Sequence, residues 1–123
     1  MDRFTKLIND FGVFAQSQYP NEGCGIVTKD FCFIPCKNLS PYPKNSFILD
    51  PISLLKYDNN IWGIFHSHPG EENPLPSEED LQHTVFDEYK FIVGFSNTYY
   101  IYSYNKIAKM LVYEPFNKEH LIN

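Results

Sequence analysis

Two histidines separated by a single serine are the residues of this sequence whose types and spacing best fit metal chemistry. His66 and His68 follow the apolar run 61–65, which has the length and the flanking turn residues of a buried strand. Residues two apart on a strand point to the same face, so both imidazoles can reach one ion. The pair is a candidate chelate, although a His-Ser-His sequence alone is weak support for one.

A carboxylate further along the chain supplies a third candidate ligand. Asp80 lies just inside an expected helix, and the Pro- and Gly-containing loop 69–76 can fold that helix start back over the strand end. Zinc held by two imidazoles and one carboxylate keeps its fourth position for water, whereas structural zinc sites are closed by four ligands. We therefore expect one catalytic Zn²⁺ ion at His66, His68 and Asp80.

A zinc-activated water also needs a proton acceptor, and Glu22 is the candidate. Zinc lowers the pKa of its water from about 15.7 toward about 7, but a carboxylate must still take that proton and pass it to the leaving group. Glu22 precedes an expected strand that begins at Gly23, and from there its side chain can reach a neighbouring strand end. We predict that Glu22 is the general acid/base.

Each of these residues also has an ordinary structural interpretation. Ser77 and Asp80 fit a helix cap and its capping-box partner, and Glu22 alone would be an exposed carboxylate. Four other acidic residues fit a solvated loop and a first helical turn, where the helix dipole favours negative charge: Glu71, Glu72, Glu78 and Glu79. The functional interpretation therefore depends on the combination.

That combination closely resembles the signature of the JAMM, or MPN-plus, metallopeptidases. The family pattern is a glutamate, a His-(Ser/Thr)-His-Pro and a Ser-x-x-Asp; here the parts are Glu22, His66-Ser67-His68-Pro69 and Ser77-Glu78-Glu79-Asp80. The segment Pro20-Asn21-Glu22-Gly23-Cys24-Gly25 is also similar to the turn that carries the glutamate in bacterial and phage members. The resemblance extends from about Glu22 to the final strands.

The resemblance implies specific roles for these positions. It makes His66, His68 and Asp80 the zinc ligands, Glu22 the general acid/base, and Ser77 a residue that steadies the oxyanion of the tetrahedral intermediate. The loop between His68 and Ser77 is one residue longer than is usual in the family, and this departure bears on the placement of Ser77. The implied fold is a curved mixed β-sheet flanked by helices, similar to that of the cytidine deaminases. A deaminase itself is disfavoured, because neither His-x-Glu nor Pro-Cys-x-x-Cys is present.

The implied activity is zinc-dependent hydrolysis of a peptide or isopeptide bond in a protein or peptide substrate. Relatives that remove ubiquitin carry insertions that grip it, and this chain is too compact for large ones. Short relatives look like processors of ubiquitin-like sulfur-carrier proteins in bacteria, or belong to tail-tip assembly proteins in phages. We favour a phage tail-tip assembly protein. The alternatives are a sulfur-carrier processor and a non-catalytic structural component of a phage tail tip.

A cupin is a further alternative, because His66, His68 and Glu72 mimic half of that barrel's metal motif. The glycines expected around the motif are missing, no second motif follows, and Pro69 interrupts the strand. The choice between Asp80 and Glu72 as the carboxylate ligand separates the two interpretations.

Helices interrupt the expected strands rather than alternating with every one of them, which predicts an α+β fold. Periodicity and turn residues predict a helix from residue 4 to just before Tyr19, a helix over 51–57 capped by Asp50, and a helix over 77–88. The expected strands are 25–28, 31–34, 47–49, 61–66, 91–95, 99–104 and 107–113, the first two forming a hairpin.

Length, composition and net charge indicate the broad class of protein. With 123 residues, 43% of them hydrophobic, we expect a single domain over 1–123 with its own core. A net charge of −5 without a basic run argues against nucleic-acid binding, and no apolar run approaches the roughly 20 residues of a membrane span. Without a signal peptide, we expect a cytoplasmic protein, or a virion protein if it is viral, with reduced cysteines. Cys32 and Cys36 fit core thiols of a strand better than half of a zinc site.

Overall fold

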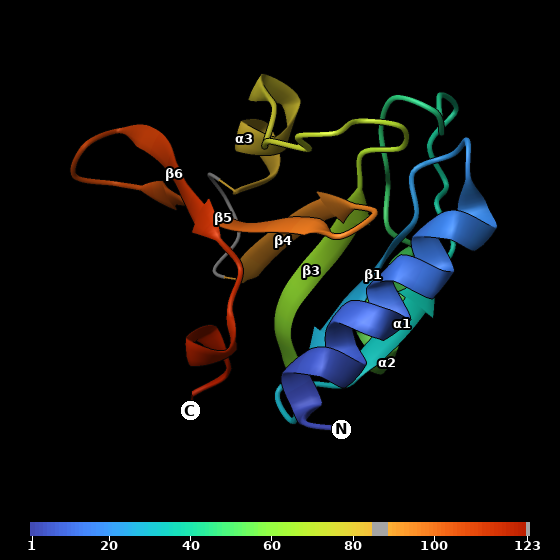
Figure 1. Ribbon diagram of the computed structural model, residues 1–123. Helices are drawn as coiled ribbons and strands as arrows, with labels where there is room; N and C mark the ends of the chain where they lie inside the picture. The colour runs from blue at the N-terminus through green and yellow to red at the C-terminus, as the bar shows by residue number, and fades with distance from the viewer. Residues whose placement is uncertain (85–88, 123) are drawn as a thin grey trace.

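The computed structural model describes residues 1–84 and 89–122 as a mixed β-sheet with helices on both faces (Figure 1). The helices are α1 (Arg3–Gln18), α2 (Pro51–Lys56), α3 (Glu78–Thr84) and the short 3₁₀ helix η1 (Lys118–Leu121). The strands are β1 (Cys24–Thr28), β2 (Phe33–Cys36), β3 (Ile61–Ser67), β4 (Lys90–Phe95), β5 (Thr98–Asn105) and β6 (Met110–Pro115).

The six strands form one sheet in the order β2-β1-β3-β4-β5-β6. Neighbouring strands are antiparallel except β3 and β4, which are parallel and pair Phe65 with Ile92 and His66 with Val93. The chain between β3 and β4 must therefore cross over the sheet, and it carries α3. The predicted α+β fold with a mixed sheet flanked by helices is confirmed.

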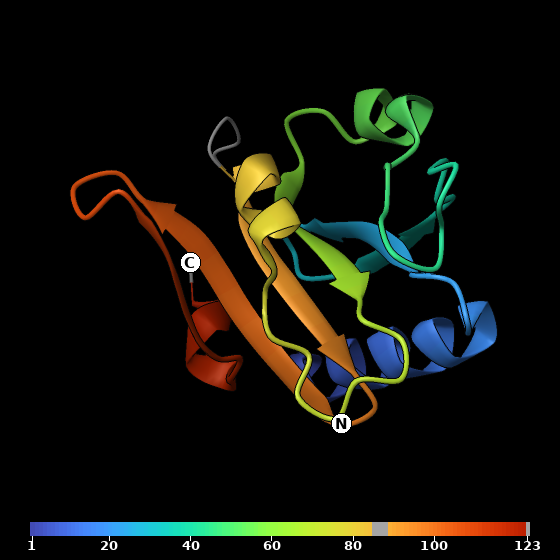
Figure 2. The same ribbon diagram turned by 90° about the horizontal axis from the view of Figure 1, so that it is seen from above.

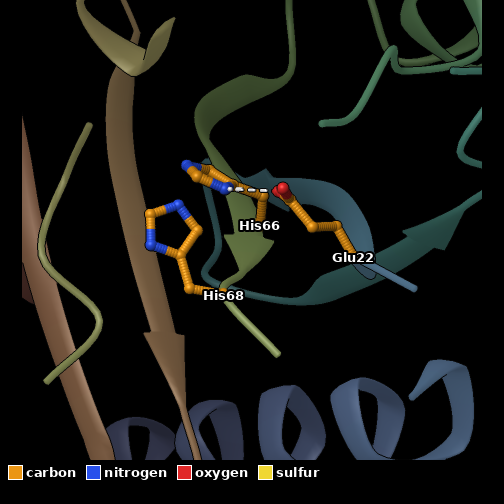
Figure 3. Close-up of side chains that lie close together, drawn as sticks. All are labelled: Glu22, His66 and His68. Atoms are coloured by element: carbon orange, nitrogen blue, oxygen red, sulfur yellow. Dashed lines mark hydrogen bonds and ion pairs between the residues drawn. The ribbon is translucent and has the colours of Figure 1, made fainter. Parts of the chain in front are cut away.

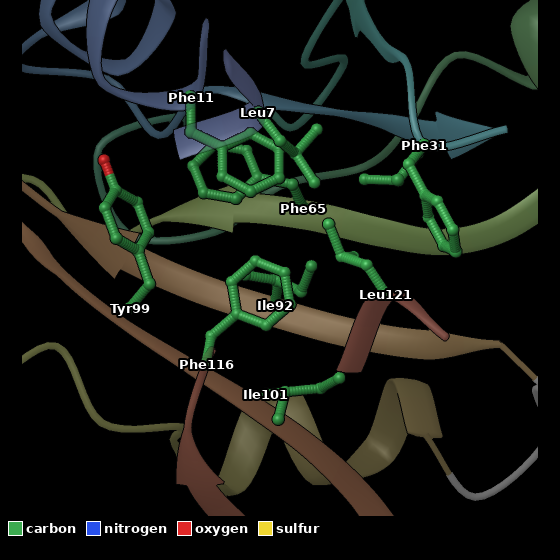
Figure 4. Close-up of a cluster of buried hydrophobic side chains, with 10 residues drawn as sticks. Leu7, Phe11, Phe31, Phe65, Ile92, Tyr99, Ile101, Phe116 and Leu121 are labelled. Atoms are coloured by element: carbon green, nitrogen blue, oxygen red, sulfur yellow. The ribbon is translucent and has the colours of Figure 1, made fainter. Parts of the chain in front are cut away.

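Helix α1 lies along one face of the sheet, and α2 and α3 lie toward the other (Figure 2). Leu7, Phe11 and Ala15 of α1 recur every four residues and are buried, which is the stripe that the sequence predicts. Phe11 stacks on Phe65 of β3, with ring centroids 4.2 Å apart, at the centre of the cluster drawn in Figure 4. A second apolar cluster on the opposite face includes Ile26, Ile64 and Tyr102.

Phe11→Ala should be the most destabilising single truncation in α1. Phe11 is 0% exposed and contacts four aromatic rings, so its removal leaves a cavity that the sheet cannot close. We expect a loss of about 3–5 kcal/mol in the free energy of unfolding, measured by urea denaturation. Val13→Ala, on the exposed side of the same helix at 73% exposure, is the matched control and should change little. Similar losses in the two variants would contradict this packing.

Most expected elements are confirmed, with differences where turns decide the boundaries. The β1–β2 hairpin forms, but β2 begins at Phe33 because Phe31 adopts a φ of 65° in the turn. The prediction that Cys32 is a core thiol is therefore wrong: it is exposed in this turn, while Cys36 is buried. Similarly, β6 begins at Met110 because residues 106–109 form the preceding turn.

Two further predictions differ in extent. The strand expected over 47–49 is only an isolated bridge between Asn38 and Leu49. The helix over 51–57 is confirmed as α2, and the Asp50 side chain accepts a hydrogen bond from the Ile52 N–H as the predicted cap. The part of the expected third helix over 85–88 lies outside the described residues. Within the described ranges, no helix combines the length and apolar character needed to cross a bilayer.

Candidate metal centre

The register between β1 and β3 brings Glu22 to the two histidines. Cys24 pairs with His66 across the antiparallel pair, and the Ser67 N–H donates to the Gly23 carbonyl at 2.9 Å, continuing the register by one step. Side chains alternate along strands, so Glu22 points to the same face as His66 and His68. Figure 3 shows the three side chains converging at this end of the sheet.

The backbone around Glu22 is held from several sides. Its N–H donates to the Pro43 carbonyl at 2.7 Å, and its carbonyl accepts from the Asn38 side-chain amide at 3.0 Å. The hydroxyl of Ser67, which lies between the two histidines, accepts from the Gly23 N–H at 2.8 Å. Ser67 is fully buried, so this bond ties the glutamate loop to the histidine strand.

His66 is fully buried and has a partner on each ring nitrogen. Its Nδ1 lies 3.2 Å from Glu22 Oε1, and its Nε2 lies 2.7 Å from the Tyr102 hydroxyl. The Phe47 ring stacks on the imidazole with centroids 4.5 Å apart. Burial, with the charges of Asp80 and Glu22, raises the pKa of Tyr102 well above its usual range, so the hydroxyl keeps its proton.

Asp80 reaches both imidazoles from the first turn of α3. Its Oδ1 lies 3.4 Å from His66 Nε2, and its Oδ2 lies 3.3 Å from His68 Nε2. Ser77 precedes α3 and caps it: the Ser77 N–H donates to Asp80 Oδ2 at 2.8 Å, and the Asp80 N–H donates to Ser77 Oγ at 3.2 Å. This reciprocal pair resembles a capping box and fixes the carboxylate over the histidines.

The pKa values of Asp80 and His68 shift in the directions expected of a carboxylate paired with an imidazole. Burial alone would raise the pKa of Asp80, but the charge of His66 and the hydrogen bonds from His68 and the Ser77 N–H lower it to about 2. Burial would lower the pKa of His68, but its hydrogen bond to Asp80 and the charges of Asp80, Glu22 and Glu71 raise it. Asp80 is therefore ionised at neutral pH, as a metal ligand must be.

The donor set is suitable for a metal ion. Glu22, His66 and His68 each offer one ligand atom, and these atoms lie within 4.8 Å of one another. Asp80 lies 3.4 Å from His66 Nε2 through Oδ1 and 3.3 Å from His68 Nε2 through Oδ2, so its carboxylate is also near both imidazoles. Two three-residue sets thus share the histidines, one completed by Glu22 and one by Asp80.

A cleft of about 420 Å³ opens beside this cluster. Its lining includes Glu22, His68 and Ser77, with Lys44 and Asn45 contributed by the loop before α2. Ser77 itself is exposed at the cleft, so the longer loop that precedes it still places it on the lining. The arrangement leaves room for a substrate next to the histidines.

Three contacts of the site were not predicted from the sequence. Tyr102 and Phe47 carry no local signal, because their contacts with His66 depend on strand pairing and on a long loop. Glu71, assigned above to a solvated loop, lies 3.1 Å from His68 Nδ1 through its Oε2. Glu72, the carboxylate of the cupin interpretation, is exposed, whereas Asp80 is buried against both histidines.

A mixed sheet with a His-x-His at the end of an inner strand, a nearby glutamate and a Ser-x-x-Asp at a following helix defines the JAMM/MPN class of domain. The chain belongs to the family described as prokaryotic homologs of the JAB domain, whose model matches residues 5–105. Members of this family are often JAMM metalloproteases.

A curated relative gives a biological setting for comparison. The chain is similar to the tail tip assembly protein K of Escherichia phage N15, at 35% identity over 82 residues. The match covers 61% of this chain but only 32% of the phage protein, so the chain spans about a third of that relative's length.

Proposed function

We propose that this protein is a zinc-dependent metallopeptidase that hydrolyses a peptide or isopeptide bond, with His66, His68 and Asp80 as the zinc ligands. The observation that carries the proposal is the position of the Asp80 carboxylate, which approaches the Nε2 atoms of both imidazoles beside an open cleft. Two imidazoles and one carboxylate with an open position form a typical catalytic zinc site.

The hydrogen bonds favour Asp80 over Glu22 as the third ligand. A carboxylate can only accept, so Glu22 and Glu71 can each accept from an Nδ1–H when the Nε2 atoms ligate zinc. The Nε2 atoms of both rings are the ones that approach Asp80, so an ion bound by both rings on this side would lie next to that carboxylate. Glu22 contacts the Nδ1 side of His66 and also lines the cleft, where its carboxylate can take part in proton transfer.

Glu22 and Ser77 have different roles in the proposed reaction. Zinc, when bound, supplies Lewis acidity to the attacking water and to the scissile carbonyl. Glu22 lines the cleft and has more than one acceptor position, so it can take the proton of the water and deliver it to the leaving amine. Ser77 Oγ accepts from the Asp80 N–H, which leaves its own O–H to donate to the oxyanion.

Zinc content and hydrolysis can be tested on one preparation. We expect one zinc per chain by elemental analysis, and zinc-dependent cleavage of a peptide library in water labelled with heavy oxygen, with the label in the new carboxylates by mass spectrometry. Chelation should abolish cleavage, and added zinc should restore it. A chain that binds no zinc at micromolar concentration would contradict the proposal.

Ser77→Ala should separate capping from catalysis. Loss of the cap should cost about 1 kcal/mol in the free energy of unfolding. Loss of the oxyanion donor should lower kcat about 100-fold with little change in KM. Ser77→Thr keeps both the acceptor and the donor and is the matched control. If Ser77→Ala lowers stability but leaves kcat unchanged, Ser77 is a cap only.

The relative in phage N15 favours a second role, in which the domain acts in assembly of a tail tip. In this setting the protein would be part of a virion, and the scissile bond would belong to a tail component rather than to a ubiquitin-like protein. Virions assembled with Glu22→Gln separate the two roles. Normal assembly and infectivity of these virions would favour the structural role. Loss of assembly or infectivity, with zinc still bound, would favour the peptidase.

A further inference from the structure

A tight turn places a second carboxylate directly against His68. The sequence His68-Pro69-Gly70-Glu71 has proline in the second position and glycine in the third, with a φ of 79° at Gly70. The Glu71 N–H donates to the His68 carbonyl at 3.3 Å and closes the turn. These are the residues and the hydrogen bond of a type II turn, in which only glycine adopts the positive φ without strain.

The turn lets the Glu71 side chain fold back onto the imidazole that precedes it. Glu71 Oε2 lies 3.1 Å from His68 Nδ1, and on the other side of the ring His68 Nε2 lies 3.3 Å from Asp80 Oδ2. When Nε2 ligates an ion, the neutral ring carries its proton on Nδ1, and that N–H can donate to Glu71. The ring is thus held between two carboxylates with different roles.

His66 has the same arrangement. Its Nδ1 faces Glu22, and its Nε2 approaches Asp80 Oδ1. His66 is fully buried and also contacts Phe47 and Tyr102, so several groups hold its ring. The side chain of His68 is 10% exposed and lies at the edge of the cleft, where fewer contacts fix it. Its orientation therefore depends more on its Nδ1 partner.

We infer that Glu71 is a positioning residue of the metal centre, which holds His68 in the tautomer and orientation that present Nε2 to the ion. The inference rests on the proposed zinc site. A carboxylate on the outer nitrogen of a metal-bound histidine fixes the tautomer and raises the basicity of the ligand, and its removal typically weakens metal affinity about 10- to 100-fold. Because the Glu71 side chain is 55% exposed, we expect the lower end of that range.

The neighbouring glutamate provides a matched control. Glu72 is exposed on the same loop and carries the same charge, but it lies outside the turn that brings Glu71 to His68. We expect Glu71→Ala to raise the zinc dissociation constant about 10-fold, measured by competition with a chromophoric chelator. Glu71→Gln retains an acceptor for Nδ1–H and should lie between Glu71→Ala and wild type. Glu72→Ala and Glu72→Gln should bind zinc as the wild type does.

A second measurement reports geometry rather than affinity. The visible absorption spectrum of the cobalt-substituted protein depends on the ligand field, so Glu71→Ala should change it and Glu72→Ala should not. Zinc affinity in Glu71→Ala equal to that of the wild type would overturn the inference while leaving the proposed zinc site intact. Equal weakening in the alanine variants of Glu71 and Glu72 would also overturn it, because loop charge alone would then explain the effect. A wild-type chain that binds no zinc would overturn both.

Discussion

Glu22→Gln is expected to retain zinc and to lose hydrolysis, with kcat about 10²- to 10⁴-fold lower. Glutamine keeps an oxygen that can accept the hydrogen bond from His66 Nδ1, so the ring keeps its orientation. It has no carboxylate to take the proton of the attacking water. The measurements are zinc stoichiometry and single-turnover cleavage of the best library peptide.

Glu79→Gln is the matched control for this variant, because Glu79 is an exposed carboxylate on the lining of the same cleft. Loss of the Glu79 carboxylate should leave kcat nearly unchanged. The Glu22 variant also separates the two possible ligand sets. If zinc affinity falls with Glu22→Gln and survives the loss of Asp80, then Glu22 completes the metal site, and the assignment of Asp80 is wrong.

Asp80→Asn is the prediction with the largest effect on metal binding. The carboxylate approaches both imidazoles, and its pKa of about 2 keeps it charged throughout the neutral range. The amide can still accept from the Ser77 N–H, so the helix start is preserved while the ligand charge is lost. We expect zinc affinity to fall by more than 100-fold, beyond the range typical of supporting residues.

Glu78→Gln, on the same first turn of α3, is the control for Asp80→Asn, since it removes an equal charge from an exposed position. Competition with a chelator measures the affinity, and circular dichroism checks that both variants fold. Zinc binding by Asp80→Asn within a few-fold of the wild type would exclude Asp80 as a ligand.

The residues of the site were accessible from the sequence because each lies at the end of an element with a clear local signal. His66 and His68 lie at the end of an apolar strand, and Ser77 and Asp80 open a helix with a capping pattern. What the sequence could not determine is the distance between these segments. That distance depends on the pairing of Cys24 with His66 and on the crossover between β3 and β4.

The structural features that the sequence did not predict depend on backbone conformation or on the pairing of distant strands. Phe31 and Lys109 adopt positive φ, which is uncommon for residues other than glycine, and each shifts the start of the strand that follows. Tyr102 reaches His66 from β5, which is separated from β3 by β4. Glu71 was the one missed contact with a local signal, because the Pro69-Gly70 pair after His68 is a turn sequence.

The parallel pairing of β3 and β4 gives the metal site a thermodynamic consequence. The chain leaves β3 at the two histidines and returns toward the sheet through α3, so an ion shared with Asp80 would cross-link the middle of the crossover to the end of β3. Such a cross-link closes a loop in the chain. It stabilises the folded crossover by a free energy that grows with the logarithm of the ratio of free zinc concentration to the dissociation constant. Zinc occupancy and the resistance of this segment to proteases should therefore rise and fall together.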